Sequence, residues 1–442
     1  MLVIILARPR TATNGVLIKT QLITVAVVNN VLAGRHSLTR TLHDCWQKHT
    51  TLSGQQKGAI QDCSYGVLRF YGQLTEILAI LLTKKPSDKN IYCLLLIGLY
   101  QLLYSRTPAY TIINQAVSAA HKLTQSKKLQ GLANAVLRNF LRQKASLLAQ
   151  AEKKETGRYS HPQWWISKLR VQYPQHYRAI LSTGNKRPAM TLRVNQRKIS
   201  VAGYQRLLTE QGMESSWIWH GALLLKKPVS VDTLPGFNKG MVSIQDAGAQ
   251  LAAPLLDISQ GMHVLDACAA PGGKSTHLLE LADISLTALD HDNVRLAQIE
   301  QNLERLEVHA SQVICGNASD PDSWWDGKLF DRILADVPCS ASGVVCRHPD
   351  IKWLRRETDL QALVSQQQVI LDALWQTLAR NGKLLYVTCS VFMEENKWLI
   401  RRFLQRHTDA QNISLSAPEL HDGQLLPNNC HDGFFYTLLH KQ

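Results

Sequence analysis

The 442-residue sequence has no apolar run of the roughly 18 residues that a membrane-spanning helix needs. This excludes an integral membrane protein built from helices. Residues 1–7 are apolar, but no basic segment precedes them and Arg8 ends the run, so they do not fit a secretion signal. We therefore expect a cytoplasmic protein. Repeats and low-complexity tracts are also missing, and the length predicts two or three domains of about 150 residues.

Paired cysteines are missing as well. The nine cysteines are an odd number and include no Cys-x-x-Cys motif, which argues against a disulfide framework and a zinc site with paired ligands. His421 and His431 lie near Cys430, but no second ligand pair has a suitable spacing, so we predict no metal. The cysteines that we expect to be small, buried core residues are Cys45, Cys63, Cys93 and Cys315.

Acidic residues are scarce in the first 150 residues, which contain 18 Lys and Arg but only four Asp and Glu. Residues 151–442 contain 31 Lys and Arg and 30 Asp and Glu. The first 150 residues therefore carry nearly all of the net charge of +15. A basic module suits a polyanion, because neutralised phosphates release counterions. A merely solubilising surface is the alternative. An anionic membrane is a weaker one, because no helix combines a Lys/Arg face with a Trp/Phe face.

Apolar residues recur at three- and four-residue steps through residues 20–150, which predicts an all-α domain. The expected helices include Ile60–Leu68, Ile91–Tyr104, Ile112–Leu123 and Leu129–Leu141. The polar residues 151–160 predict a linker. Residues 161–256 mix short helices with alternating stretches such as Met190–Val194 and Ser216–Trp219, a pattern typical of a small α/β module.

Residues 257–442 alternate strand-like with helical segments, which predicts a Rossmann-like, doubly wound and mostly parallel sheet. The expected strands are His263–Asp266, Ser285–Asp290, Gln312–Cys315, Phe330–Val337 and Lys383–Val387. The expected helices are Lys274–Ala282, Asn293–Leu306 and Leu360–Leu378. In such sheets, ligands bind beyond the carboxyl ends of the strands.

A glycine-rich turn, Asp266–Ser275, follows the first of these strands. Gly272 and Gly273 allow backbone N–H groups to approach a ligand, and the helix that follows favours negative charge. A triphosphate-binding loop would need glycine at Cys268, and the dinucleotide fingerprint is absent. An adenosyl ligand with a carboxylate remains, with Asp290 placed for its ribose hydroxyls. A purely structural turn is the alternative.

Two cysteines, Cys339 and Cys389, stand at the ends of two further strands, and Asp336 accompanies the first. They are either inert buried fillers or reactive thiols. A thiolate, a carboxylate and an adenosyl methyl donor together suit methylation of carbon 5 of a pyrimidine. Thiolate addition to carbon 6 gives an enamine whose carbon 5 attacks the methyl group, and the carboxyl group stabilises charge at the N3/N4 edge. The base must be unstacked, which favours single strands, loops or flipped bases.

These motifs resemble those of the RNA cytosine-5 methyltransferases. The likeness runs from about residue 20 to the carboxyl end and is strongest in Asp266–Ser275, Asp336–Ser340, Arg347–Trp353 and Thr388–Ser390. The helical region is similar to the NusB-like RNA-binding domain, notably in Gly131–Arg138. Together they resemble bacterial 16S ribosomal RNA methyltransferases that carry a NusB-like extension.

The resemblance implies a class I methyltransferase domain that uses S-adenosylmethionine and acts on 16S ribosomal RNA. In this family the cysteine of the Thr-Cys-Ser strand end, here Cys389, is the nucleophile, and Cys339 assists product release. Asp336 lies beside both cofactor and base. DNA cytosine-5 methyltransferases use the Pro-Cys cysteine and lack the second one, so the pair indicates RNA. The residues implied to bind the cofactor are Cys268, Ala269, Ala270, Pro271, Gly272, Gly273, Lys274, Asp290, Asn317 and Asp336.

Two positions depart from the family's pattern. Asn317 stands where an aspartate usually contacts the adenine edge; it keeps an acceptor oxygen, and Asp320 could supply the charge if the loop bends. Cys346 beside Arg347 interrupts a basic pair, which predicts one weaker phosphate contact. Two alternatives remain: a decayed methyltransferase that only binds RNA during assembly, and the same chemistry on transfer RNA. None of these functions requires more than a monomer.

Overall fold

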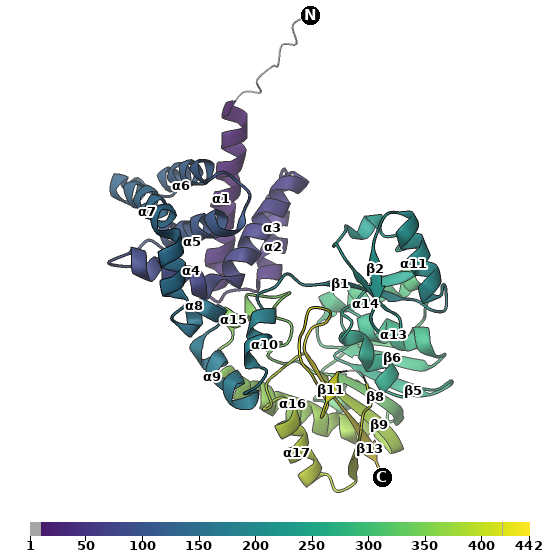
Figure 1. Ribbon diagram of the computed structural model, residues 1–442. Helices are drawn as coiled ribbons and strands as arrows, with labels where there is room; N and C mark the ends of the chain where they lie inside the picture. Colours follow the sequence, from purple (N-terminus) through teal and green to yellow (C-terminus); the bar gives the residue numbers. More distant parts are fainter. Residues whose placement is uncertain (1–9, 418) are drawn as a thin grey trace, which may run out of the picture. The chain divides into compact units, whose positions relative to one another are not determined.

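The computed structural model describes residues 10–417 and 419–442, so the apolar segment 1–7 lies outside the described residues. The chain divides into two compact units (Figure 1). Of the described residues, the first unit comprises 10–185 together with His348–Arg356, and the second comprises the remainder, within Lys186–Arg347 and Glu357–Gln442. No helix in the described part of the chain is both long and apolar enough to cross a membrane.

The first unit is helical, as predicted. Its helices are α1 Arg10–Leu32, α2 Leu38–Lys48, α3 Gly54–Arg69, α4 Tyr71–Leu81, α5 Lys89–Tyr104, α6 Ala109–Leu123, α7 Lys127–Ala151, α8 Glu155–Tyr159, α9 Gln163–Gln172, α10 Tyr177–Thr183 and α15 Ile351–Leu354. Helix α5 is rich in buried apolar residues, and it contacts α1, α3, α4, α6 and α7. Side chains cap the helix starts: Ser53 and Gln56 form a capping box on α3, and Asp88 accepts two backbone N–H bonds on α5.

The linker predicted at residues 151–160 is wrong, because this segment contains α8 and packs against α4. Ala151 and Tyr159 are buried, and the Thr156 hydroxyl donates to Glu76 at 2.7 Å. Gly157 lies so close to the Ala151 carbonyl that an added Cβ would clash. The helix is only five residues long, too short for periodicity to reveal its buried face.

A short segment from the later part of the chain, His348–Arg356, also belongs to the first unit. Its Asp350 carboxylate accepts the backbone N–H of Leu38 at 2.9 Å. Lys352 is fully buried, and its Nζ donates to Asn185 at 2.7 Å and to a backbone carbonyl at the end of α3 at 2.8 Å. Burial lowers the pKa of this lysine. These buried hydrogen bonds, formed with residues far away in the sequence, make the segment an integral part of the helical unit.

The second unit begins with a small four-stranded antiparallel sheet in the order β2-β3-β1-β4. Its strands are β1 Met190–Val194, β2 Ser215–Trp217, β3 Ala222–Leu225 and β4 Val242–Ile244, and its helices are α11 Val201–Glu210, η1 Val231–Thr233, η2 Ala249–Leu251 and α12 Ala252–Leu255. Together with α11, the sheet encloses its own core around Leu192, Tyr204 and Leu223. A small α/β module is therefore present as predicted, but α9 and α10, which the prediction included in it as part of residues 161–256, belong to the first unit.

A nine-stranded sheet forms the rest of the unit, along the path β11-β12-β13-β9-β8-β5-β6-β7 with β10 beside β13. Its strands are β5 His263–Ala267, β6 Ser285–Asp290, β7 Gln312–Cys315, β8 Phe330–Asp336, β9 Leu378–Thr388, β10 Ala410–Ile413, β11 Leu420–His421, β12 Gln424–Leu425 and β13 Phe434–Lys441. The remaining helices are α13 Gly273–Leu281, α14 Asn293–Leu306, η3 Pro321–Ser323, α16 Asp359–Thr377 and α17 Lys397–Arg406. Strands β5 to β9 are parallel, as predicted, whereas the antiparallel strand β13 was not foreseen.

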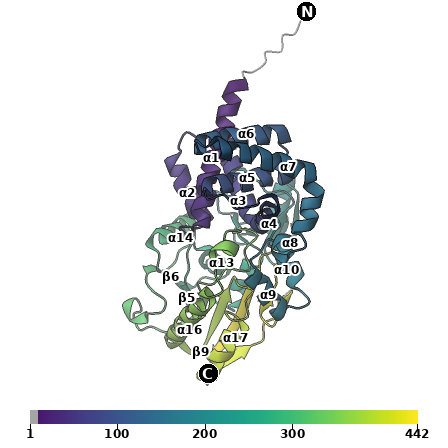
Figure 2. The ribbon, with the colours of Figure 1, turned by 90° about the vertical axis from the view of Figure 1, so that its left-hand side faces the viewer.

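Alternate strand residues serve the two faces of this sheet. Val264, Leu334 and Leu385 pack in the core with α12, α13 and α14. Their chain neighbours on the opposite face pack in the core with α16 and α17. Figure 2 shows these two helices beside the sheet. Successive side chains of a strand point to opposite faces of the sheet. A strand that is apolar along almost its whole length therefore contributes side chains to both cores. The loops at the carboxyl ends are thereby held on a rigid frame.

Candidate functional site

The glycine-rich turn between β5 and α13 is fixed by bonds from other elements. Gly272 has a φ of 92°, and an added Cβ would lie 3.1 Å from Ile299 Cα, so only glycine fits this position well. The Pro271 carbonyl accepts from Asn302 at 3.0 Å, and the Ala270 carbonyl accepts from Arg295. The turn is therefore shaped by the chain itself before any ligand binds.

Asp290, at the end of β6, supports this turn from beside it. One carboxylate oxygen accepts the backbone N–H of Ala270 at 2.9 Å, and the other accepts that of Asp292 at 3.0 Å. The side chain is buried, yet it lines a cavity of about 200 Å³ together with Cys268 and Asn317. A cavity with apolar walls and a few polar groups is the usual form of a nucleoside site.

Asn317 lies at this cavity, as the sequence suggested, but its acceptor oxygen is already engaged. It accepts the Ser319 backbone N–H at 3.1 Å and the Ser319 hydroxyl at 2.8 Å. An adenine amino group would compete with Ser319 for this oxygen. Asp320, the residue that could have supplied the missing charge, is exposed and is not among the residues lining the cavity.

Lys274 and Asp336 join the turn to the end of β8. Lys274 Nζ donates to the Asp336 carboxylate at 2.6 Å, and both side chains are mostly buried. Burial opposes the charge of Lys274, but the Asp336 charge and hydrogen bond outweigh it and raise the pKa of Lys274. Burial, together with the charges of Asp336 and Asp290, raises the pKa of Cys268, so that thiol stays protonated.

The two strand-end cysteines meet. Cys339 follows β8 and Cys389 follows β9, two neighbouring parallel strands, and their Sγ atoms are 3.4 Å apart. Cys339 is buried, whereas Cys389 is partly exposed. Its hydrogen bond with Cys389 and its burial raise the pKa of Cys339. Cys339 therefore remains a thiol that can share its proton with Cys389.

Three family models match the chain. They are described as the NusB family over residues 19–142, the ferredoxin-like domain of RsmF/B-like methyltransferases over residues 161–232, and 16S rRNA methyltransferase RsmB/F over residues 253–440. Ribosomal RNA small subunit methyltransferase B of Vibrio cholerae is 43% identical over 413 residues, covering 92% of this chain and 94% of the relative. The enzyme of the same name from Pasteurella multocida is 43% identical over 439 residues, covering 96% and 97%.

The chain belongs to the RsmB/F family of 16S ribosomal RNA methyltransferases. The crystal structure of PH0851 has the same fold, with a TM-score of 0.76 and 23% identity, covering 95% of this chain and 99% of that one. NSun6 from Pyrococcus horikoshii, solved with SFG, gives a TM-score of 0.58 at 19% identity, covering 63% of this chain and 98% of that one. The predicted NusB-like domain and methyltransferase fold are thus confirmed.

The sequence of this RsmB/F-family chain did not reveal the residues of the small sheet that bond to the glycine-rich turn and to α13. Arg193, on β1, is fully buried; it pairs with Glu280 of α13 at 2.7 Å and donates to the Gly273 carbonyl at 2.5 Å. It also donates to Gln245 at 2.7 Å. These residues lie far apart in the sequence and form no motif, so nothing short of the folded chain reveals the contact.

The structure changes the expectation for one cysteine outside this site. Cys45, Cys63 and Cys93 are buried as expected, but the prediction for Cys315 is wrong, because it is exposed. It ends β7, the outermost strand on its side of the sheet, where no further strand covers it.

Cys346 donates to Asp432 at 3.0 Å rather than facing an open surface. Arg347 beside it pairs with Asp432 and, at 2.8 Å, with Asp246. Burial opposes the arginine's charge, but the two aspartates outweigh it and raise the pKa of Arg347. This arginine is therefore committed to carboxylates within the second unit. A phosphate contact at this position would have to displace one of them.

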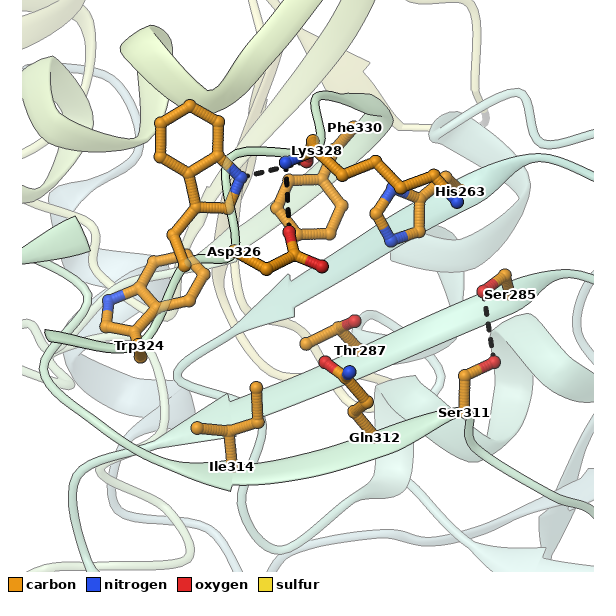
Figure 3. Close-up of a pocket in the computed structure, with 11 residues that line it drawn as sticks. His263, Ser285, Thr287, Ser311, Gln312, Ile314, Trp324, Asp326, Lys328 and Phe330 are labelled. Carbon is orange, nitrogen blue, oxygen red and sulfur yellow. Dashed lines mark hydrogen bonds between the residues drawn. The ribbon is translucent and has the colours of Figure 1, made fainter. Parts of the chain in front are cut away.

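A second cavity, of about 160 Å³, lies near the opposite ends of the same strands (Figure 3). His263, Ser285, Gln312 and Phe330, at or beside the starts of β5 to β8, line it. Since the cofactor edge of such a sheet is the carboxyl edge, we assign this cavity no part in the reaction. Within the described residues, no group of three or more His, Cys, Asp or Glu side chains could hold a metal ion.

Asp266, the first residue of the turn, is a fully buried carboxyl group. One oxygen accepts from Ser275 at 2.6 Å, whereas the other has no partner within the described residues. Burial raises the pKa of Asp266 from 3.8 to about 7, although the Ser275 bond opposes the shift. The folded state thus retains a proton that the unfolded chain releases. This contribution to stability is complete below pH 3.8 and is lost as the pH rises through about 7.

We expect Asp266→Asn to remove this pH-dependent part of the free energy of unfolding, which corresponds to about 1.4 kcal/mol per unit of pKa shift. The measurement is urea unfolding of both proteins between pH 5 and pH 8. The wild type should lose stability relative to the variant as the pH rises. Asp322→Asn, the same change at an exposed position, is the control. A wild-type-to-variant difference that is constant with pH would contradict the assignment.

Proposed function

We propose that this chain transfers a methyl group from S-adenosylmethionine to carbon 5 of a cytosine in 16S ribosomal RNA, through a covalent adduct with Cys389. The observation that carries the proposal is the 3.4 Å approach of Cys389 to Cys339 at the carboxyl edge of the sheet. One buried thiol would be a filler. Two thiols in contact, beside a paired carboxylate, match a reaction with separate addition and release steps.

The cofactor fits the residues at the turn. S-adenosylmethionine supplies an electrophilic methyl group when it is bound. The ribose would be held at Asp290, whose oxygens each keep acceptor capacity, and the adenine would enter the cavity beside Asn317. The start of α13, at Gly273 and Lys274, suits the carboxylate of the amino acid moiety. The N–H groups of Ala269, Ala270 and Gly272 donate within the fold, and Pro271 has none, so these four site residues act by shaping the turn.

The chain's own residues activate the base. The Cys389 thiolate adds to carbon 6 of the cytosine, and the ring's electron pair moves to carbon 5, which becomes the nucleophile. Asp336, held by Lys274, is placed to stabilise the charge that develops at the N3/N4 edge. The ion pair also fixes the carboxylate before the base arrives, so that little reorganisation is needed during the reaction.

Release requires two bonds to break. The proton on carbon 5 passes to a water molecule, the electron pair of the broken C–H bond reforms the double bond between carbons 5 and 6, and the Cys389 sulfur departs as a thiolate. Cys339 is the nearest thiol to that sulfur and has a raised pKa. It can hydrogen-bond to the departing thiolate and stabilise it as it leaves. The proposal assigns Cys339 to this step.

The first unit supplies the RNA grip in this proposal. Helices α6 and α7 contain six Lys and Arg and no acidic residue between residues 109 and 151. A groove of about 610 Å³ on these helices is lined by amide and hydroxyl side chains and by Lys127. Amides, hydroxyls and lysines are the groups that commonly contact phosphate and sugar. Such contacts position RNA while the catalytic pocket reads the extruded base.

We expect the double change Lys127→Gln and Lys128→Gln to weaken RNA binding and flatten its dependence on salt. The logarithmic salt slope should fall by roughly 0.7 to 0.9 for each bound phosphate that is no longer neutralised. Filter binding or fluorescence anisotropy at several salt concentrations measures both. Lys226→Gln with Lys227→Gln, another adjacent exposed pair, is the matched control. Equal slopes in all three proteins would mean that the charge on α7 only solubilises the domain.

The experiment that tests the function is transfer of labelled methyl groups from S-adenosylmethionine to deproteinised 16S ribosomal RNA, with intact small subunits and transfer RNA in parallel. Label recovered as 5-methylcytosine in the ribosomal RNA supports the proposal. Label on transfer RNA alone would keep the mechanism and replace the substrate. Folded protein that binds RNA but transfers no label would favour an assembly factor without catalytic activity.

A further inference from the structure

A buried glutamate, Glu395, connects the loops that carry the two cysteines. It lies between β9 and α17 and is completely buried. Its carboxylate accepts the backbone N–H and the hydroxyl of Ser340 at 2.7 and 2.5 Å. It also accepts the Ser390 hydroxyl at 2.5 Å and the Gln367 amide at 3.0 Å. Ser340 directly follows Cys339, and Ser390 directly follows Cys389.

These four bonds use the whole acceptor capacity of the carboxylate, two on each oxygen. A single side chain thus fixes the backbone and the hydroxyl on one loop and the hydroxyl on the other. In the dry interior such a fully satisfied network is rigid, because breaking any bond leaves a buried polar group unpaired. The network therefore fixes the spacing between the residues that follow the two cysteines.

The two loops do not depend on Glu395 equally. Cys389 directly follows the eleven-residue strand β9, and the preceding Thr388 is separately bonded to Asn396 at 2.6 Å. Cys339 instead follows β8 by three residues, on a loop. Next to Cys339, this loop is held by Glu395 and by Gln367, whose amide also donates to the Pro338 carbonyl at 2.9 Å. Farther along the loop, the Gly343 N–H donates to the Cys389 carbonyl at 2.9 Å and the Ser342 hydroxyl accepts the Val391 N–H at 2.9 Å, but neither bond holds Pro338 or Ser340. Loss of Glu395 therefore frees Cys339 more than Cys389.

We propose that Glu395 is a positioning residue that holds Cys339 beside Cys389 for the release step. The inference rests on the proposed function, since it assumes that the two cysteines act in different steps. Glu395 bonds to Ser340 and Ser390, the residues that follow the two cysteines, and its charge also contributes to the raised pKa of Cys339. Its removal should leave attack by Cys389 intact and slow the departure of the methylated base.

The test separates these steps with two RNA substrates. Cytosine carries a proton on carbon 5, so its adduct can be released. 5-Fluorocytosine carries a fluorine that cannot leave as a proton does, so its adduct accumulates and reports addition and methyl transfer alone. Glu395→Ala should lower turnover on ordinary RNA by about 10- to 100-fold, since a misplacement of about 1 Å can cost 10²-fold. Its denaturation-resistant adduct with ordinary RNA should increase, while adduct formation with 5-fluorocytosine RNA should match the wild type.

Two further variants keep the test decisive if Glu395→Ala folds poorly. Glu395→Gln should recover part of the turnover, because serine hydroxyls can rotate and accept from the new amide. Ser340→Ala removes one hydroxyl from the Cys339 loop and should slow release in the same selective way, to a smaller extent. Glu300→Ala, on the exposed side of α14, is the control and should behave as the wild type.

Parallel losses of turnover and of 5-fluorocytosine adduct in Glu395→Ala and Ser340→Ala would overturn the proposal, because the network would then support the whole site. Unchanged turnover in both variants would overturn it as well. A wild-type protein that forms no adduct on 5-fluorocytosine RNA would instead refute the covalent mechanism itself. The two failures are therefore distinguishable.

Discussion

Replacing Cys389 with alanine is expected to abolish methyl transfer and to leave no covalent protein–RNA adduct. Without the thiolate, carbon 5 of cytosine is too weak a nucleophile to attack a methyl group, so the loss should be on the order of 10⁴-fold or more. Cys389 is the more accessible of the two contacting thiols, and the raised pKa of Cys339 makes that residue a poor substitute. Labelled-methyl transfer and a denaturing gel with labelled RNA measure both results.

Cys315→Ala is the matched control for this variant, because it removes an exposed thiol that ends β7. It should retain full activity. Binding of S-adenosylmethionine should be unaffected in Cys389→Ala, since no cofactor-binding role is assigned to that side chain. An adduct that survives in Cys389→Ala and disappears in Cys339→Ala would reverse the two assignments.

Replacing Cys339 with alanine is expected to give the opposite result, a protein that becomes trapped on its RNA. Cys389 would still add to carbon 6 and the methyl group would still be transferred. The elimination that expels Cys389 would lack the neighbouring thiol at 3.4 Å. We expect an adduct that resists denaturation and methyl incorporation that stops at a single group per protein molecule. Gel shift under denaturing conditions and a burst of label without steady turnover are the measurements.

The double variant with both cysteines changed to alanine is the control for the trapped complex, and it should form none. Normal turnover by Cys339→Ala would show that another group, such as a water molecule, releases the product. If Cys339→Ala formed little covalent adduct and its first methyl transfer were slowed as much as its turnover, Cys339 would be needed for the addition step itself. Either result would remove the separate release role.

Most of the fold followed from periodicity. Helix α14 and strands β6 and β7 begin and end at the residues predicted, because their apolar patterns are uninterrupted and bounded by turn residues. The antiparallel strands β10 to β13 were missed. Two of them have only two residues, too few for any alternation to show. Strand β12 is placed by its pairing with β13, and β11 by its pairing with β12, rather than by their own sequences.

The site residues divide in the same way. The glycine-rich turn, Asp336 and the two cysteines stand in short local motifs, and a parallel sheet brings strand ends together regardless of their separation. Asn317 showed the limit of this reasoning. The sequence predicted an acceptor oxygen at this position for the adenine edge. In the structure, that oxygen accepts from the Ser319 N–H and hydroxyl, a contact that depends on the backbone conformation of the loop.

By itself, the sequence determined the helical and parallel-sheet architecture, the basic character of the first unit and the presence of two cysteines at strand ends, to which we assign the reaction. These depend on composition, on periodicity and on neighbours a few residues apart. Only the tertiary structure decided that Arg193 braces the turn, that Glu395 connects the two cysteine loops and that His348–Arg356 belongs to the helical unit. Each of these contacts is a buried polar contact between distant segments. Such groups are stable only when folding supplies all their partners at once, and no local pattern in the chain records that arrangement.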